Sequence, residues 1–177
     1  MNEAYAGWHA LPWTAGEPPA LPWLPASGDL LDINVWLALA VQEHPHHEAA
    51  RRYWAEVQAR AGAGLPGAPS LWFCRVSMLG LVRLLCQPKV VGEGALTLPS
   101  AFALYRQFRA VPQVGLLAEP PGCDERLQAL VTAGTLPTRL WTDAYFAALA
   151  QASALRLVTF DQDFRRFGLE RCLVLAH

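Results

Sequence analysis

The stretch Asp29-Leu-Leu-Asp-Ile-Asn-Val-Trp36 decides how the rest of the chain is interpreted. It is a short apolar run that reaches Asp32 and Asn34, after which the apolar residues follow the spacing of a helix. We expect a strand over 30–33 and a helix over about 34–42, with Asn34 as its N-cap. A buried strand with a carboxylate at its carboxyl end is how parallel sheets present groups to a ligand.

Two later stretches supply the same kind of side chain. Leu140-Trp-Thr-Asp-Ala-Tyr145 predicts a helix that begins with Thr142 as N-cap and carries Asp143 in its first turn. Leu157-Val-Thr-Phe-Asp-Gln-Asp163 predicts a strand that ends just before Asp161. Taken singly, each aspartate has a structural explanation, as a helix or turn cap or as a charge that favours a helix dipole. Taken together, they meet at one sheet edge if the two strands are neighbours.

Size and composition limit the class of protein. A chain of 177 residues suits one domain, and 53% apolar against 16% charged residues favours an interior packed on both faces of a sheet. No apolar run reaches the roughly 18 residues of a membrane span, and no signal peptide is visible, so we expect a soluble, cytoplasmic protein. A net charge of −1 excludes a general polyanion binder, and four scattered cysteines predict buried free thiols rather than a zinc site.

The chain divides into two parts. Residues 1–28 hold three tryptophans among five prolines, which predicts an extended arm that packs on the domain or a partner, with disorder as the alternative. Residues 29–177 alternate strands with helices, which predicts a parallel sheet with right-handed crossovers. The expected strands are 30–33, 71–74, 114–117, 155–160 and 172–175. The expected helices are 34–42, 48–61, 76–86, one opened by Thr97 or Pro99, 124–133 and 142–153, with a short turn over 163–167.

Three carboxylates at one edge would repel one another strongly unless a cation neutralised them. An all-oxygen set of ligands, without cysteine or a clear histidine set, favours Mg²⁺ or Mn²⁺. Such a site activates water and stabilises the charge of an in-line attack on a phosphodiester. We therefore take Asp32, Asp143 and Asp161 as the candidate catalytic and metal-binding residues.

These motifs resemble the PIN-domain family, in particular VapC-type ribonuclease toxins of bacterial toxin–antitoxin pairs. The resemblance covers residues 30–175 and rests on three pieces in this order: 30–40 with His-Pro-His-His at 44–47, 141–148, and 157–164. It implies a PIN-like three-layer α/β/α fold with a parallel sheet of about five strands in the order 3-2-1-4-5. It also implies Mg²⁺- or Mn²⁺-dependent cleavage of RNA, a homodimer and a cognate antitoxin. Asn34 and Asp163 are expected to assist the three acids.

One position departs from the family. The family usually places a second acid on the helix after the second strand, whereas this chain reads Ser77-Met-Leu-Gly-Leu-Val-Arg83, with Met78 at that place. A thioether is a poor ligand for a hard cation, so one metal ion is expected to be supported better than two. We count Ser77 as a secondary site residue. Arg83 is expected to need a carboxylate partner, with the metal-site edge as one candidate.

Several basic residues are candidates for contact with RNA. Arg165 and Arg166 follow Asp161, and Arg139 precedes the helix of Asp143, so all three are expected to reach phosphates. The alternative is that they are ordinary solvent-exposed residues on the surface. The histidines of 44–47 are expected to lie in a loop between helices rather than to bind metal.

Two other functions remain open. A degenerate PIN module that binds RNA or a protein without efficient cleavage is the main alternative, because Met78 replaces the usual Glu. A phosphatase-like hydrolase is the other, but it needs a dedicated lysine, and Lys89 is the single lysine in the chain.

Overall fold

A five-stranded parallel sheet organises the structure, a computed structural model that describes residues 28–61, 70–134 and 136–176. The sheet order is β3-β2-β1-β4-β5, which confirms the predicted order 3-2-1-4-5. The predicted N-terminal extension, apart from Gly28, and the loop of residues 62–69 lie outside the described residues. The strands are β1 (Asp29–Leu31), β2 (Leu71–Phe73), β3 (Val114–Leu116), β4 (Arg156–Thr159) and β5 (Cys172–Val174).

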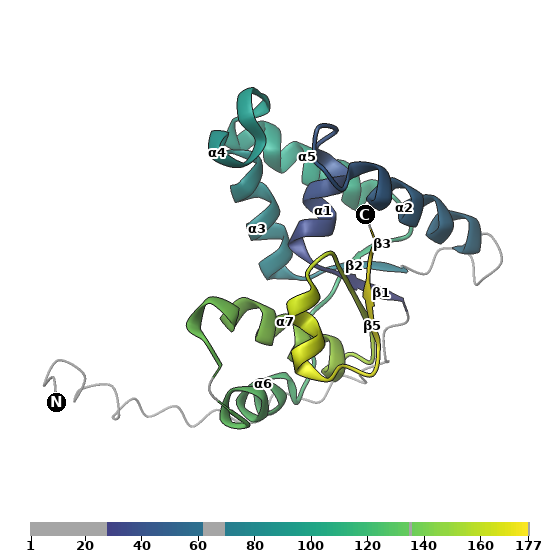
Figure 1. The fold of residues 1–177 in the computed structure, drawn as a ribbon. Helices are drawn as coiled ribbons and strands as arrows, with labels where there is room; N and C mark the ends of the chain where they lie inside the picture. The colour runs from purple at the N-terminus through teal and green to yellow at the C-terminus, as the bar shows by residue number, and fades with distance from the viewer. Residues whose placement is uncertain (1–27, 62–69, 135, 177) are drawn as a thin grey trace, which may run out of the picture.

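Helices cover both faces of this sheet, as Figure 1 shows. One layer contains α1, α2, α3 and α5, and the opposite layer contains α6 and α7. The helices are α1 (Ile33–Ala40), α2 (His47–Ala61), α3 (Arg75–Leu85), α4 (Pro88–Val91), α5 (Leu98–Ala110), α6 (Cys123–Thr132) and α7 (Trp141–Ala152). Short 3-10 helices are η3 (Gly92–Gly94), η4 (Thr138–Leu140) and η5 (Gln162–Phe167).

The central position of strand β1 in the sheet explains why its sequence is apolar at consecutive positions. Leu30 and Leu31 are both fully buried, but Leu31 packs with α1, α2, α3 and α5, whereas Leu30 packs with α6 and α7. A central strand of a parallel sheet is covered on both faces, so its residues do not alternate between apolar and polar. The three-layer prediction is therefore confirmed by the packing of two adjacent leucines.

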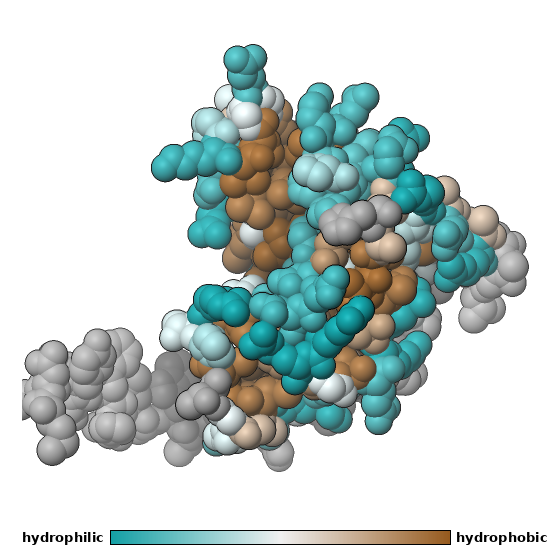
Figure 2. Space-filling view, in the orientation of Figure 1, coloured by the Kyte–Doolittle hydropathy of each residue, from teal (hydrophilic) through white to brown (hydrophobic). Residues whose placement is uncertain are grey.

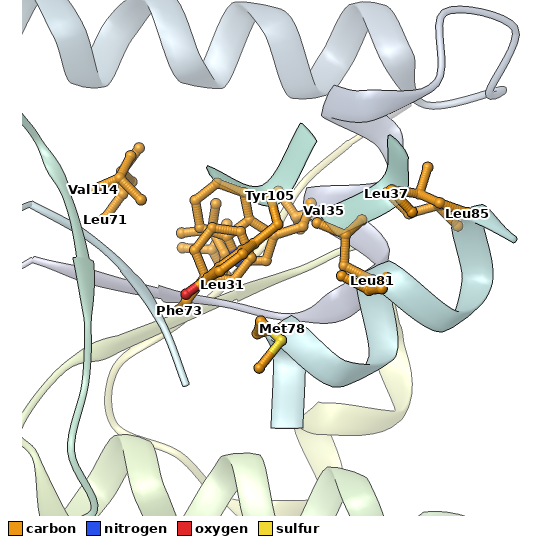
Figure 3. Close-up of a cluster of buried hydrophobic side chains, with 14 of the residues drawn as sticks. Leu31, Val35, Leu37, Leu71, Phe73, Met78, Leu81, Leu85, Tyr105 and Val114 are labelled. Carbon is orange, nitrogen blue, oxygen red and sulfur yellow. The ribbon is translucent and has the colours of Figure 1, made fainter. Parts of the chain in front are cut away.

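The larger core lies under α1, α3 and α5 (Figure 3). Trp36 on α1 stacks on Phe73 of β2, with ring centroids 3.6 Å apart, and both rings are fully buried. Gly80 allows α3 to approach α1 closely, because a Cβ at that position would lie 2.5 Å from Cδ1 of Ile33. The two helices that follow β1 and β2 are thus packed directly beside the carboxyl edge of the sheet.

A charged network fixes the opposite, amino-terminal edge. The Arg156 guanidinium donates two hydrogen bonds to the buried Asp29 carboxylate, at 2.8 and 2.6 Å, and the Tyr53 hydroxyl donates a third at 2.5 Å. Bidentate contacts of this kind are geometrically specific. The network therefore fixes β4 against β1 and attaches α2 to both strands.

Two local predictions were wrong. Helix α1 begins at Ile33, and its N-cap is Asp32 rather than Asn34. Helix α7 has Leu140 at its N-cap, because η4 runs directly into it, so Thr142 lies inside the first turn. Pro88 begins the short helix α4, which was not predicted, because the fixed backbone angle of proline suits the first helical position.

The cysteine prediction is correct in part. All four cysteines are free, but Cys86 and Cys172 are only half-buried, while Cys74 and Cys123 are buried. Burial, followed by the charge of Glu119, raises the pKa of the Cys123 thiol to about 11. A thiol with so high a pKa is protonated at neutral pH, which agrees with a packing role.

Candidate active site

The pairing of β1 with β4 places Asp32 beside Thr159. Leu31 lies opposite Val158 in the register, and the Asp32 backbone N–H continues the ladder to the Val158 carbonyl at 3.0 Å. Asp32 then caps α1, because its Oδ1 accepts a hydrogen bond from the Ile33 N–H at 2.6 Å. The end of one strand and the start of one helix therefore fix this carboxylate.

The other oxygen of Asp32 accepts from side chains. The Thr159 hydroxyl donates to Asp32 Oδ2 at 2.8 Å, and Asn34 Nδ2 donates to the same oxygen at 2.6 Å. Asn34 Oδ1 in turn accepts from the Phe160 N–H at 3.2 Å, and Thr159 Oγ1 accepts from the Asp161 N–H at 2.9 Å. This network connects Asp32 to the backbone that carries Asp161, so Asn34 and Thr159 are positioning residues.

Burial dominates the electrostatics of Asp32. Its side chain is buried, and desolvation, with smaller contributions from the charges of Asp143 and Asp161, raises the pKa of the carboxyl to about 6. The hydrogen bonds from Thr159 and Ile33 act in the opposite direction and lower the pKa. A buried carboxylate that is costly to ionise gains most from a nearby cation.

Asp143 and Asp161 lie within electrostatic range of Asp32. Asp143 is half-buried in the first turn of α7, as predicted, and burial, then the charges of Asp161 and Asp163, raise its pKa. Asp161 is exposed after β4 and caps η5 by accepting the Asp163 N–H at 2.8 Å. None of the three acids forms an ion pair with a residue that the structure describes.

The three carboxylates are suitable ligands for a hard cation, but their side chains do not lie close enough together to form a complete metal site. Within 28–61, 70–134 and 136–176, no three His, Cys, Asp or Glu side chains lie close enough to hold a metal ion. Carboxylate oxygens are the ligands that Mg²⁺ and Mn²⁺ prefer. The residues present therefore fit such an ion in type, with Asp32 fixed by its hydrogen bonds and Asp143 and Asp161 more exposed to solvent.

Asp163, expected to assist the three acids, is paired with two arginines of the same chain. Its carboxylate accepts from Arg139 at 3.0 Å and from Arg166 at 2.8 Å. These two hydrogen bonds, that of Arg139 first, lower the pKa of Asp163. Two of the three arginines predicted to contact RNA are therefore paired within the protein, whereas the exposed Arg165 makes no side-chain hydrogen bond or ion pair with a described residue.

On helix α3, the side chains of Ser77 and Met78 make contacts within the fold. The fully buried Ser77 hydroxyl caps the helix, accepting from the Cys74 N–H at 2.9 Å and donating to the Cys74 carbonyl at 3.0 Å. Met78 is 8% exposed and belongs to the core shown in Figure 3. Arg83 is exposed and, among the described residues, has no carboxylate partner, so that prediction was wrong.

The histidine loop lies beside the strand end but has no ligand cluster among the described residues. The His46 ring stacks on Phe160 with centroids 4.4 Å apart, and His47 Nδ1 lies 2.8 Å from the Ala38 carbonyl oxygen. Burial, then the neighbouring histidines, lowers the pKa of His44. The loop thus packs against the residue that precedes Asp161, as expected for a connection between helices.

Sequence inspection missed Thr159 as a site residue. Its side chain is fully buried and touches both the Asp32 carboxylate and the Asp161 backbone. A threonine among the apolar residues of β4, two positions before an aspartate, was the available signal. Its meaning depends on the β1–β4 register, which sequence alone does not provide.

A parallel α/β sheet with carboxylates at the carboxyl ends of neighbouring central strands defines the class of this protein. The sequence model of the PIN domain matches residues 30–169, so the chain belongs to the PIN-domain family. It is 35% identical over 143 residues to Ribonuclease VapC41 of Mycobacterium tuberculosis, covering 78% of this chain and 92% of that protein. Ribonuclease VapC38 of the same species is 32% identical over 132 residues, covering 75% and 84%.

Solved structures agree on the fold. The crystal structure of Mycobacterium tuberculosis VapC20, described as a Sarcin-Ricin loop cleaving toxin, superposes with a TM-score of 0.56 at 17% identity, covering 80% of this chain and 96% of that one. Rickettsia felis VapBC2, bound to a DNA fragment from its promoter, gives 0.58 at 13% identity, covering 84% and 98%. No helix in the described part of the chain has the length and apolar character needed to cross a membrane.

Proposed function

We propose that this chain is an endoribonuclease that acts as the toxin of a toxin–antitoxin pair. The relatives that match most of its length are named ribonucleases of the VapC group. The observation that carries the proposal is the fixed, buried Asp32 carboxylate at the β1–β4 junction, with Asp143 and Asp161 in electrostatic range. Its site residues are Asp32, Asp143 and Asp161, and its cofactor is Mg²⁺ or Mn²⁺.

A bound divalent ion supplies an activated water and charge stabilisation for in-line attack on a phosphodiester. The chain's own residues prepare the site for this ion. Thr159 and Asn34 hold the Asp32 carboxylate in one orientation, and Thr159 holds the backbone of Asp161. Asp143 and Asp161 extend the acidic surface from the buried strand end towards solvent. An RNA backbone can therefore approach from the exposed side.

The proposed partners are an antitoxin, RNA and a second copy of the chain, all in the cytoplasm. An apolar groove of about 840 Å³ between α3 and α5 supports the homodimer. Leu79 and Leu98 line it and are 59% and 65% exposed. Exposed apolar residues that border one continuous surface commonly mark a protein–protein interface. Figure 2 shows hydrophobic residues gathered on this part of the molecule.

A non-cutting PIN module is the second candidate, and Met78 is the observation that favours it. The thioether occupies the place of the family's usual acid and packs in the core. The phosphatase-like candidate has no comparable support, because Lys89 is exposed on α4 and contacts none of the three acids.

Incubation of the purified chain with structured RNAs in Mn²⁺ or Mg²⁺, and in EDTA, separates the two candidates. The nuclease proposal expects metal-dependent cutting that Asp32→Asn abolishes. The matched control is Asp124→Asn, the same change at an exposed acid on α6, which should cut like the native chain. RNA that stays intact with every metal, while still being bound, would favour the non-cutting module.

A further inference from the structure

A basic cleft lies on the β3 side of the sheet, and none of the three acids lines it. It has a volume of about 430 Å³ and lies between the start of α3, helix α5 and the end of β3. Three of its lining residues are arginines, Arg75, Arg106 and Arg109, and none is acidic. The other lining residues are Phe102, Tyr105, Ala110 and Leu116.

The charge of this region contrasts with that of the whole chain. Residues 70–117 carry five basic residues and a single acidic one, Glu93, although the net charge of the chain is −1. The remaining residues are therefore net acidic. Helices α3 and α5 contain no carboxylate, so the arginines of the cleft have no neutralising partner on the helices that carry them.

Two of the three arginines have no side-chain partner among the described residues, and the third is held in place by a backbone carbonyl. Arg75 and Arg106 are exposed, and neither makes a side-chain hydrogen bond or an ion pair with a described residue. Arg109 is half-buried, and its Nη1 donates to the Val114 carbonyl at 2.5 Å, which fixes its guanidinium at the cleft. An arginine fixed in this way loses less entropy when it binds a phosphate.

The register of the sheet relates this cleft to the acidic site. Asp29 pairs with Leu71 and Leu30 with Trp72, so β1 and β2 end at the same level. Asp32 follows β1 directly, and Arg75 begins the helix after β2, one strand away, where neighbouring strands are about 5 Å apart. The Arg75 end of the cleft therefore lies at the edge that carries Asp32, on the side opposite β4, and the cleft runs from there along β3 to Arg109.

We infer that Arg75, Arg106 and Arg109 form a phosphate-binding subsite that holds the RNA backbone beside the acidic site. Arginine is well suited to phosphate, because its planar guanidinium donates two parallel hydrogen bonds. Arg139 and Arg166 are already paired with Asp163, which leaves Arg165, Arg75 and Arg106 as the exposed arginines near this edge that have no ion pair with a described residue. The inference rests on the proposed function only for the identity of the ligand.

The test measures binding and cutting separately. Binding of a short fluorescein-labelled single-stranded RNA is followed by anisotropy in EDTA, in an Asp32→Asn background, with and without Arg75→Gln/Arg106→Gln. The control is Arg51→Gln/Arg52→Gln, two exposed arginines on α2 that undergo the same change of charge. Circular dichroism and thermal melting establish that each variant is folded.

We expect the cleft variant to bind RNA about 10-fold more weakly than the control. Its plot of log affinity against log salt should be flatter by about 0.7 for each lost phosphate contact. In the native background, the same change should raise KM for cutting with little effect on kcat. Equal RNA binding by the cleft and control variants, or no RNA binding by the Asp32→Asn chain, would overturn the subsite. If the native chain does not cut RNA but the cleft variant still binds RNA more weakly than the control variant, only the nuclease proposal is refuted.

Discussion

The Thr159 hydroxyl donates a 2.8 Å hydrogen bond to Oδ2 of Asp32 across the junction of β4 and β1. The same oxygen of Thr159 accepts the backbone N–H of Asp161 at 2.9 Å. One buried hydroxyl therefore orients an acid on one strand end and the backbone of an acid on the next. Residues that orient ligands in this way commonly change metal affinity or activity when they are altered.

Removal of this hydroxyl should impair the site more than the fold. We expect Thr159→Val to reduce RNA cutting by roughly 10- to 100-fold and to lower the free energy of unfolding by about 1–2 kcal/mol. Thr159→Ser keeps the hydroxyl and should retain most of the activity. Single-turnover cutting and urea unfolding of both variants check the prediction, and equal activities for valine and serine would refute the positioning role.

The stability of the protein should depend on pH through Asp32. Burial raises the folded-state pKa of Asp32 from 3.8 to about 6, so the folded state binds the proton more tightly than the unfolded state between these values. The contribution of Asp32 to stability is therefore fully present below pH 3.8 and is lost as pH rises through 6. A shift of about two pKa units corresponds to roughly 3 kcal/mol.

Urea unfolding of the native chain and of Asp32→Asn, in EDTA at pH 4 and pH 7, measures this contribution. The native chain should lose roughly 2.4 kcal/mol more than the variant between the two pH values, slightly less than the full shift because at pH 4 the unfolded-state carboxyl is already more than half ionised. Other titrating groups are common to both proteins and largely cancel. A smaller loss for the native chain than for Asp32→Asn would contradict the prediction. It would show that the fold stabilises the ionised carboxylate, through exposure to solvent or through a nearby positive charge.

The close approach of α1 and α3 depends on Gly80. Gly80→Ala adds a Cβ that would lie 2.5 Å from Cδ1 and 3.0 Å from Cγ1 of Ile33, the residue after Asp32. We expect a loss of about 1–3 kcal/mol in the free energy of unfolding, despite the better helix propensity of alanine. Thermal unfolding beside Ile33→Val/Gly80→Ala tests the cause, since a smaller side chain at position 33 should restore part of the loss.

Met78 should act as a core residue rather than as a ligand. Met78→Leu conserves volume, so it should cost less than about 1.5 kcal/mol and leave metal-dependent cutting intact. Met78→Glu places a carboxylate at a position that is 8% exposed among apolar residues, and it should cost about 2 kcal/mol or more. A gain of cutting by Met78→Glu would contradict this account and support the non-cutting module.

Much of the fold could be predicted from the sequence because burial on both faces leaves a clear pattern. The apolar run around Leu30 and the helical spacing after it indicate a central strand and its helix. Boundaries were less accurate where two residues compete for one cap. Asp32 and Asn34 are both good N-caps, and the register that places Asn34 against Thr159 decided between them.

The site was predictable where topology alone brings residues together. Asp32 and Asp161 follow β1 and β4, which are neighbours, so their proximity follows from the strand order. The fate of Asp163 was not predictable, because its pairing with Arg139 joins segments 24 residues apart through side chains. The basic cleft was missed for the same reason, since Arg75 and Arg106 meet only once α5 packs on α3.

The most direct test of the account is the binding of Mn²⁺ to the purified chain by titration calorimetry at pH 7.5. We expect one site per chain, with affinity reduced at least 10-fold in each of Asp32→Asn, Asp143→Asn and Asp161→Asn, and unchanged in Asp124→Asn. Binding that is unaffected by all three site substitutions, or no binding by the native chain, would contradict the claim that these three acids together hold a metal ion.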